Sequence, residues 1–444
     1  MRTMPARPAP APTAVPVASA PRTPATAGPD LDAASPRPAH RWAGQEILND
    51  PITAQVLYAA WSGDPAVVVP SPPGAGKTRL VALLGAALAE RAELRVGVAA
   101  QTRDQAVELA RRIGAQTDAA TLMWSAKHAV PDVGGATVAT KGARFPGERG
   151  GILIATTARW LYAEPADVGC DLMIVDEAWQ ATYADLGALG AHARQVVCVG
   201  DPGQVAPVVT GETGRWQTSP TGPHLPAPDA LLAAHGDAVG VVRLRHTWRL
   251  GPATTALVQG AFYPGLPFTS RRPPEHLTDA GGQPVRELAH RVVTVNAGPT
   301  DPALIHACAD RARELLTHHL TTASGSRPIT AADVAVVCAH VTQAAAIRAT
   351  LSDHPDLLIG TANQLQGLER PAVVTLHPLA GYRDAGGFGT DTGRACVMLS
   401  RHRAHLTVVV DAATSAVLAS AADDAPGVAV QRGVTDELLA LPAA

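Results

Sequence analysis

The sequence predicts an α/β protein built from two tandem domains with parallel sheets. From residue 41 onward, short apolar and β-branched runs alternate with Ala- and Leu-rich stretches that favour helices. The runs that we interpret as buried strands are Val67–Val69, Arg95–Ala99, Ile152–Ala155, Leu172–Val175, Val196–Val199, Val334–Val337, Ala372–Leu376 and Leu406–Val410. Apolar strands with helices between them are typical of parallel sheets covered on both faces. A break in the pattern near Arg243 divides the strands between two sheets.

The length of 444 residues is enough for two or three domains with cores of their own. We expect a first domain over residues 41–243, a second over residues 244–425 and a C-terminal tail over residues 426–444. Residues 1–40 contain ten prolines and eleven alanines and almost no large apolar side chain. Such a segment cannot bury enough surface to fold, so we expect a disordered N-terminal tail.

Composition narrows the classes of function. The net charge of −3 gives no global basic field, so a site for a polyanion has to be a local groove. No apolar run is long enough to span a membrane. The five cysteines are isolated and lack the spacing of metal ligands or of a disulfide framework. This usage is typical of a reducing compartment, so we expect a cytoplasmic protein.

A glycine-rich loop, Ser71–Thr78, follows the first strand and precedes a predicted helix. Gly74 and Gly76 allow the backbone to curl so that its N–H groups face an anion, and the helix N-terminus adds a positive end. Lys77 can reach the β- and γ-phosphates of ATP, and the Thr78 hydroxyl can ligate Mg²⁺. The loop therefore predicts an ATP and Mg²⁺ site. Ser71 replaces the first glycine of the usual pattern, and an ordinary Gly/Pro turn before a helix is the alternative.

Two later strands end in polar residues that suit hydrolysis of the γ-phosphate of ATP. Asp176 ends one strand and can hold Mg²⁺, and Glu177 beside it can deprotonate an attacking water. Gln204 closes the segment Gly200–Gln204 after the next strand and can sense the γ-phosphate. Taken alone, these segments also fit a polar strand end and an Asp-Pro-Gly turn.

These three segments, in this order, resemble motifs I, II and III of the superfamily 1 helicases. Segments similar to motifs Ia, Ic, IV, V and VI follow in register at residues 96–110, 152–160, 246–267, 360–376 and 397–406. The match spans about residues 45–412. Motifs IV and V look like those of the branch that contains the nonsense-mediated-decay helicase and its DNA-repair relatives. The resemblance implies two tandem RecA-like P-loop domains.

The resemblance also implies roles in nucleotide binding. Gln55 corresponds to a glutamine that reads adenine, and Glu369 to a residue that contacts the ribose. Trp248 replaces a tyrosine that stacks on adenine, although a core tryptophan is an equal alternative. The phosphate-binding set is Gly74, Ala75, Gly76, Lys77, Thr78 and Arg79.

Two arginines of the second domain correspond to residues that reach the γ-phosphate. They are Arg249 and Arg401, which complete a catalytic set with Lys77, Glu177 and Gln204. Arg403 competes for the role of Arg401, and a basic surface patch is the plain alternative for this segment.

Four residues fall where the family touches the nucleic-acid backbone. They are Thr102, Thr156, Thr361 and Gln364, for which solvated loop positions are the alternative. The resemblance implies an ATP-dependent helicase or translocase that moves along single-stranded DNA or RNA. We expect a monomer without membrane attachment, and a targeting protein as a candidate partner. The alternatives are a nucleic-acid-stimulated ATPase that does not unwind duplexes and an ATP-gated clamp or protein-remodelling module.

Overall fold

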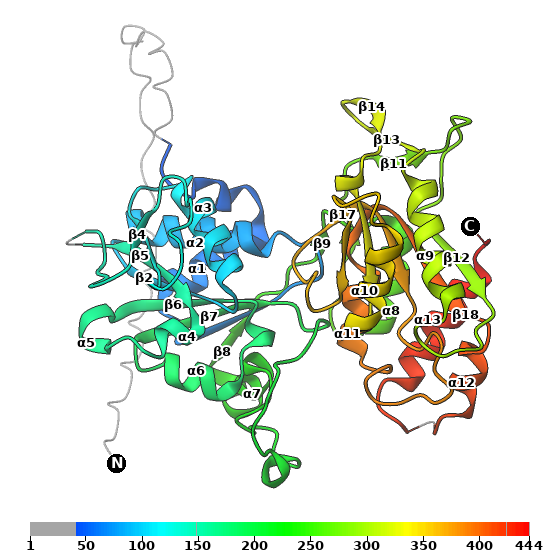
Figure 1. The fold of residues 1–444 in the computed structure, drawn as a ribbon. Helices are drawn as coiled ribbons and strands as arrows, with labels where there is room; N and C mark the ends of the chain where they lie inside the picture. The colour runs from blue at the N-terminus through cyan, green and yellow to red at the C-terminus, as the bar shows by residue number, and fades with distance from the viewer. Residues whose placement is uncertain (1–40, 148, 423, 444) are drawn as a thin grey trace, which may run out of the picture. The chain divides into compact units, whose positions relative to one another are not determined.

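The computed structural model describes residues 41–147, 149–422 and 424–443, and Figure 1 labels its helices and strands. The predicted disordered tail over residues 1–40 lies outside the described residues. No helix in the described part of the chain is long and apolar enough to cross a membrane.

The first half of the chain forms an eight-stranded sheet in the order β4-β3-β5-β2-β6-β7-β1-β8, and every strand pair in it is parallel. Its strands are β1 (Ala66–Pro70), β2 (Arg95–Ala100), β3 (Ala120–Met123), β4 (Thr137–Ala139), β5 (Gly151–Thr156), β6 (Cys170–Asp176), β7 (Ala193–Gly200) and β8 (Val239–Val241). Because all strands run the same way, the segments that follow β1, β6 and β7 meet at one edge of the sheet.

Helices cover both faces of this sheet (Figure 1). They are the 3₁₀-helix η1 (Gln45–Asn49) and α1 (Pro51–Ser62), α2 (Lys77–Arg91), α3 (Arg103–Gly114), α4 (Thr157–Trp160), α5 (Pro165–Val168), α6 (Tyr183–Leu189) and α7 (Ala227–His235). The helix α2, which starts directly at the phosphate loop, buries an unbroken run from Leu80 to Ala89 against the strands. This burial fixes the helix N-terminus relative to the sheet edge.

The second half forms a five-stranded parallel sheet in the order β12-β18-β17-β15-β16. Its strands are β12 (Leu288–Val293), β15 (Val334–Cys338), β16 (Leu358–Thr361), β17 (Arg370–Leu376) and β18 (His402–Asp411). The helices around it are α8 (Pro252–Phe262), α9 (Pro302–Leu315), α10 (Val341–Thr350), α11 (Thr392–Leu399), α12 (Thr414–Ser420) and α13 (Val428–Ala440). A small antiparallel sheet joins β11 (Glu275–Thr278), β13 (His319–Thr322) and β14 (Gly325–Pro328), and β9 (His246–Thr247) pairs with β10 (Thr269–Ser270).

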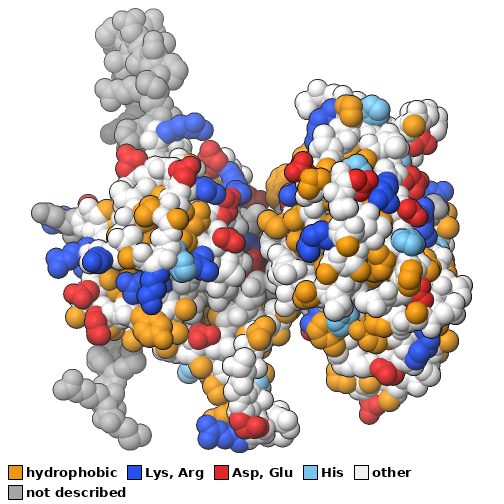
Figure 2. Space-filling view, in the orientation of Figure 1, with side chains coloured by type: hydrophobic (Ala, Val, Ile, Leu, Met, Phe, Trp, Pro, Cys, Tyr) orange, Lys and Arg blue, Asp and Glu red, His pale blue; other side chains and the backbone are white. Residues whose placement is uncertain are grey.

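The predicted fold class is confirmed: two tandem α/β domains with parallel sheets, and all eight predicted strands lie in them. The interpretation of residues 426–444 as a tail is wrong. Helix α13 in this segment buries Val428, Val434 and Leu438 and packs on α8 and α12. Its apolar residues recur at helical spacing, so it completes the covering of the second sheet. Basic and acidic side chains intermingle on the face shown in Figure 2, in keeping with the small net charge.

Candidate active site

The phosphate loop connects β1 to α2, and its two glycines adopt left-handed backbone angles. Gly74 has φ = 71° and Gly76 has φ = 85°, a region that residues with a Cβ rarely enter. The loop also rests on the start of the second half. The Thr247 hydroxyl donates to the Pro73 carbonyl at 2.7 Å, and the Trp248 amide donates to the Gly74 carbonyl at 2.9 Å. These bonds bring the next residue, Arg249, to the loop.

Lys77, the first residue of α2, is 8% exposed and faces two carboxylates. Its Nζ lies 3.6 Å from Oδ2 of Asp201 and 4.0 Å from Oε1 of Glu177. These acids follow β7 and β6, so parallel strand order alone gathers the charges at the phosphate loop. The two carboxylates therefore hold the ammonium group of Lys77 at the loop, where a phosphate group can also bind it.

Asp176 is the last residue of β6 and is buried. Among the described residues its Oδ1 has no hydrogen-bond partner. Burial, together with the charge of Glu177, raises the pKa of Asp176 to about 7. A buried carboxylate oxygen without a partner suits a cation, and Thr78 lines the same cavity. Asp176 and Thr78 thus fit a Mg²⁺ ion.

Glu177 has φ = 50°, one of two described non-glycine residues with a positive φ. This left-handed conformation ends β6 abruptly and starts the 3₁₀-helix η2 (Ala178–Gln180). Non-glycine residues adopt it at a cost of about 1–3 kcal/mol, and such positions concentrate at functional sites. The turn aims the Glu177 carboxylate at Lys77.

A cavity of about 480 Å³ brings together most of the predicted nucleotide-site residues. Its walls come from both halves of residues 42–444, which form one compact unit. The first half contributes Gly74, Ala75, Gly76, Lys77, Thr78, Arg79, Glu177 and Gln204, and the second contributes Trp248, Arg249, Glu369 and Arg401.

Arg249 pairs with Glu369 through its Nε and donates to the Ser400 carbonyl at 3.2 Å. Burial opposes the ionisation of Glu369, but the charges and hydrogen bonds of Arg249 and Arg403 outweigh it and lower the pKa of Glu369. Arg403 also pairs with Glu275 of β11 at 3.1 Å. Arg403 thus supports Glu369, whereas Arg401 lines the cavity itself.

The Arg401 guanidinium is 2% exposed. It donates to the carbonyls of Val397 and Leu368 at 3.1 Å and 3.4 Å and to the Ser400 hydroxyl at 3.1 Å. Burial, followed by the charge of Arg249, lowers its pKa to about 10, so it stays charged at neutral pH. This burial contradicts the alternative of a basic surface patch.

Sequence reasoning missed the part played by Asp201, which lies in the segment Gly200–Gln204 but received no role of its own. Its carboxylate is buried, pairs with Lys77 and accepts from Nε2 of Gln204 at 2.6 Å. Oε1 of Gln204 accepts in turn from Nε2 of Gln366 in the second half at 3.1 Å. The only available signal was the position of Asp201 directly after a buried strand, beside the predicted Gln204.

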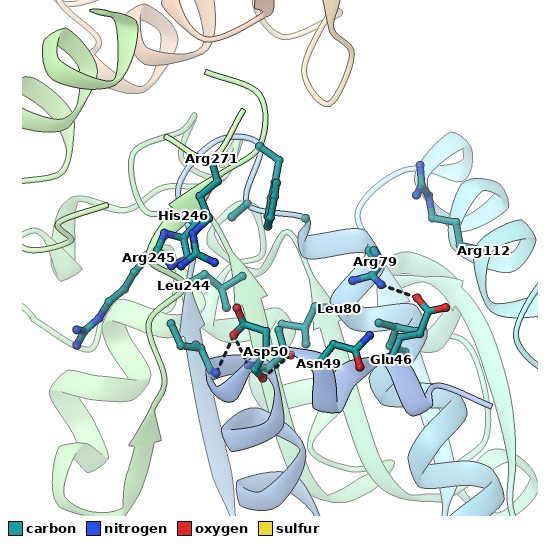
Figure 3. Close-up of a pocket in the computed structure, with 17 residues that line it drawn as sticks. Glu46, Asn49, Asp50, Arg79, Leu80, Arg112, Leu244, Arg245, His246 and Arg271 are labelled. Carbon is teal, nitrogen blue, oxygen red and sulfur yellow. Dashed lines mark hydrogen bonds and ion pairs between the residues drawn. The ribbon is translucent and has the colours of Figure 1, made fainter. Parts of the chain in front are cut away.

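Trp248 is 52% exposed, so the core-tryptophan alternative is wrong. It lines the cavity above and a neighbouring one of about 610 Å³, shown in Figure 3. In Figure 3, His246 and Arg271 lie on one side of this second cavity, and Asn49 and Asp50 lie on the other. An exposed indole beside the phosphate loop can stack on a nucleobase.

Gln55 lines neither cavity, so the structure does not bring it to the phosphate loop and Trp248, and its adenine contact stays a prediction. Helix α1 buries Val56, Ala59 and Ala60, and this helical phase turns Gln55 to solvent. Asn49 and Asp50, just before α1, line the cavity of about 610 Å³ instead.

The residues predicted to contact nucleic acid divide into two pairs. Thr102 and Gln364 line one cavity of about 620 Å³ that also reaches Asp176 and Glu177. The hydroxyl of Thr156 accepts from the Arg159 amide at 3.2 Å, and that of Thr361 accepts from the Gln364 amide at 3.3 Å. Thr156, Thr361 and also Thr102, the N-cap of α3, therefore have local capping roles that account for their residue types.

Comparison with known proteins matches an AAA domain to residues 53–222 and a second AAA domain to residues 301–413. The DNA-binding protein SMUBP-2 of Rattus norvegicus is 25% identical over 264 residues, and that of Mus musculus is 26% identical over 265 residues. Each alignment covers 55% of this chain, and the chain spans only 25% of the length of these relatives.

Solved structures with a similar arrangement include the Arterivirus nonstructural protein 10 helicase, with a TM-score of 0.43 and 15% identity, covering 80% of this chain and 62% of that one. The PRRSV helicase has a TM-score of 0.41 and 16% identity, covering 80% and 54%. The two matched models define a tandem AAA-domain protein. Together with the SMUBP-2 relatives and the order of the motifs along both domains, they support the interpretation of the chain as a superfamily 1 helicase.

Proposed function

We propose that the protein is an ATP-dependent helicase or translocase that hydrolyses ATP to move along single-stranded nucleic acid. One observation carries the proposal: a single cavity is lined by the phosphate loop and Glu177 from the first half and by Arg249 and Arg401 from the second. An ATPase whose parts come from two domains can convert loss of a phosphate into domain movement.

The residues divide the chemistry among them. Lys77 binds the β- and γ-phosphates, and Glu177 accepts the proton of the attacking water. Arg249 and Arg401 stabilise the charge that builds on the transferred phosphoryl group, and the buried setting strengthens this effect. A Mg²⁺ ion held by Thr78 and Asp176 would neutralise charge on the phosphates. Trp248 stacks on the base.

Hydrolysis removes the γ-phosphate that the two arginines of the second domain bind. The second domain then binds the nucleotide less tightly. A strand bound across both domains then advances. The cavity lined by Thr102 and Gln364 supports strand binding beside the ATP site. The name of the SMUBP-2 relatives favours DNA as the first strand to test. We also propose that the protein is a monomer and that it is cytoplasmic. The five buried free cysteines support the second of these proposals.

The decisive experiment measures the ATPase rate with single-stranded DNA, with single-stranded RNA and with neither, at low and high salt. We expect a polynucleotide to raise the rate, and the effect to fade with salt because binding releases counterions. Hydrolysis without any stimulation favours the clamp or protein-remodelling alternative. Stimulation without displacement of a labelled strand from a duplex favours a translocase that does not unwind.

A further inference from the structure

The loop after β7 belongs to the first sheet by sequence but packs against the second half. Val205 is buried and belongs to the same apolar cluster as Val258, Tyr263 and Leu399 of the second half. A Cβ placed on Gly393 of α11 would lie 2.6 Å from the Gln204 carbonyl oxygen, so α11 lies directly on this loop. The state of Gln204 is therefore open to influence from the second half.

Tyr263, which follows α8, makes the most direct contact. It is 2% exposed, and its hydroxyl donates to Oδ1 of Asp201 at 2.7 Å. A Cβ on Gly203 would lie 2.6 Å from Cε1 and from the hydroxyl oxygen of Tyr263, so only glycine admits the ring here. Burial, together with the charge of Asp201, raises the pKa of Tyr263 well above its ordinary value, so the hydroxyl remains a donor.

Asp201 passes this contact on to the nucleotide site. Its Oδ1 also accepts from the Gly203 amide at 3.0 Å, while its Oδ2 accepts from Gln204 at 2.6 Å and faces Nζ of Lys77 at 3.6 Å. One carboxylate thus holds two of the groups that we assign to the γ-phosphate. When Lys77 turns to a phosphate, Tyr263 and the Gly203 amide remain to balance the buried charge.

We propose that Tyr263 is a positioning residue for ATP hydrolysis, which acts from the second domain by fixing Asp201 and, through it, Lys77 and Gln204. The inference rests on the proposed function of the site. It assigns Tyr263 an effect on turnover rather than on nucleotide affinity, because Tyr263 does not line the cavities that hold the phosphate loop and Trp248.

The test compares kcat and KM for ATP in the wild type and in Tyr263→Phe. Losing a hydrogen bond to a buried carboxylate and loosening Gln204 should lower kcat about 10-fold. KM should change less than about 3-fold. Tyr382→Phe is the matched control, because it removes a hydroxyl that bonds Nε2 of His340 at 2.6 Å, and neither residue lines the nucleotide cavities. It should leave kcat unchanged.

Gly203→Ala provides a second route to the same contact, since its Cβ displaces the Tyr263 ring. If both variants act through Asp201, the double variant loses no more turnover than the worse single variant. Thermal midpoints of all variants identify a general loss of folding. The inference is overturned if kcat is unchanged in Tyr263→Phe, or if the losses are additive in the double variant. The proposed function still holds in either case, provided that the wild type hydrolyses ATP. Absence of wild-type hydrolysis overturns the proposed function itself.

Discussion

Nε of Arg249 donates a hydrogen bond to Oε2 of Glu369, so the arginine assigned to the γ-phosphate is neutralised by the carboxylate assigned to the ribose. Both residues line the same cavity. A nucleotide that engages Arg249 has to compete with this carboxylate. The charge of Arg249, one of the two arginines that the second domain contributes to the cavity, is thus already compensated.

Glu369→Gln should raise the affinity for ATP about 3-fold, because Arg249 then has no opposing charge to leave. Fluorescence titration with a labelled ATP analogue measures this. Glu275→Gln is the control, since Glu275 pairs with Arg403 and not with Arg249. Weaker binding in Glu369→Gln would instead indicate that this carboxylate contacts the nucleotide directly.

Lys77→Ala should reduce ATP turnover by about 10³-fold or more, since the phosphates lose their main side-chain cation. The change also leaves Asp201 and Glu177 without a cation between them, which costs stability. The double variant Lys77→Ala/Asp201→Asn should recover the thermal midpoint but not the turnover. Near-normal hydrolysis by either variant contradicts the assignment of the phosphate loop.

Arg401→Ala and Arg403→Ala should behave differently although the residues are two positions apart. Arg401 lines the nucleotide cavity, and removing such a finger commonly costs about 10³-fold in rate. Within the described residues, the side chain of Arg403 donates hydrogen bonds to Glu275 and Glu369 only. Its loss should therefore lower the hydrolysis rate less than about 10-fold. Steady-state hydrolysis with nucleotide and strand binding measured on the same samples separates the two. Equal losses would contradict the distinction.

Trp248→Ala should raise KM for ATP about 10-fold, because stacking of a base on an aromatic ring contributes about 1–3 kcal/mol. Trp248→Phe should keep most of the affinity. Trp61→Ala serves as the control, because Trp61 is also exposed but lines neither nucleotide cavity. If the base does not stack here, all three variants will bind ATP alike.

Stability should decrease as the pH falls from about 6.5 towards 4. Burial lowers the pKa of His377 to about 4, and burial also lowers the pKa of His405 to about 4. The unfolded chain, with ordinary histidine pKa values near 6.5, then binds more protons than the folded one, so the free energy of unfolding is highest above this range. Urea titrations at pH 7.5 and 5 measure the slope. His377→Gln should flatten it, and an identical slope would contradict the assignment.

The strands were predictable because the local sequence alone indicates that they are buried. Val67–Val69 and Val334–Val337 are continuous apolar runs, and both are fully buried in the sheets. The small sheet was not predictable. Its strand β14, Gly325–Pro328, is exposed throughout and has no apolar alternation. Antiparallel pairing with β13, and not intrinsic preference, makes this segment a strand.

The same division holds for the site. Lys77, Asp176 and Glu177 follow buried strands, and a local pattern suffices to find them. The ion pair of Lys77 with Asp201 depends on β1 lying next to β7, which no local pattern contains. Gln55 is the opposite case. Its spacing from Lys77 along the chain fits the family, but this spacing does not determine which face of α1 the side chain occupies.

The burial of Val205 in the second core has a consequence for dissecting the molecule. A fragment that begins after Arg243 contains every strand of the second sheet but lacks Val205, which belongs to the same apolar cluster as Val258 and Leu399. A cut after Arg243 therefore removes a buried side chain from the core of one fragment and leaves an apolar loop exposed in the other. The chain has two sheets, but two halves that are expressed separately would not each contain a complete hydrophobic core.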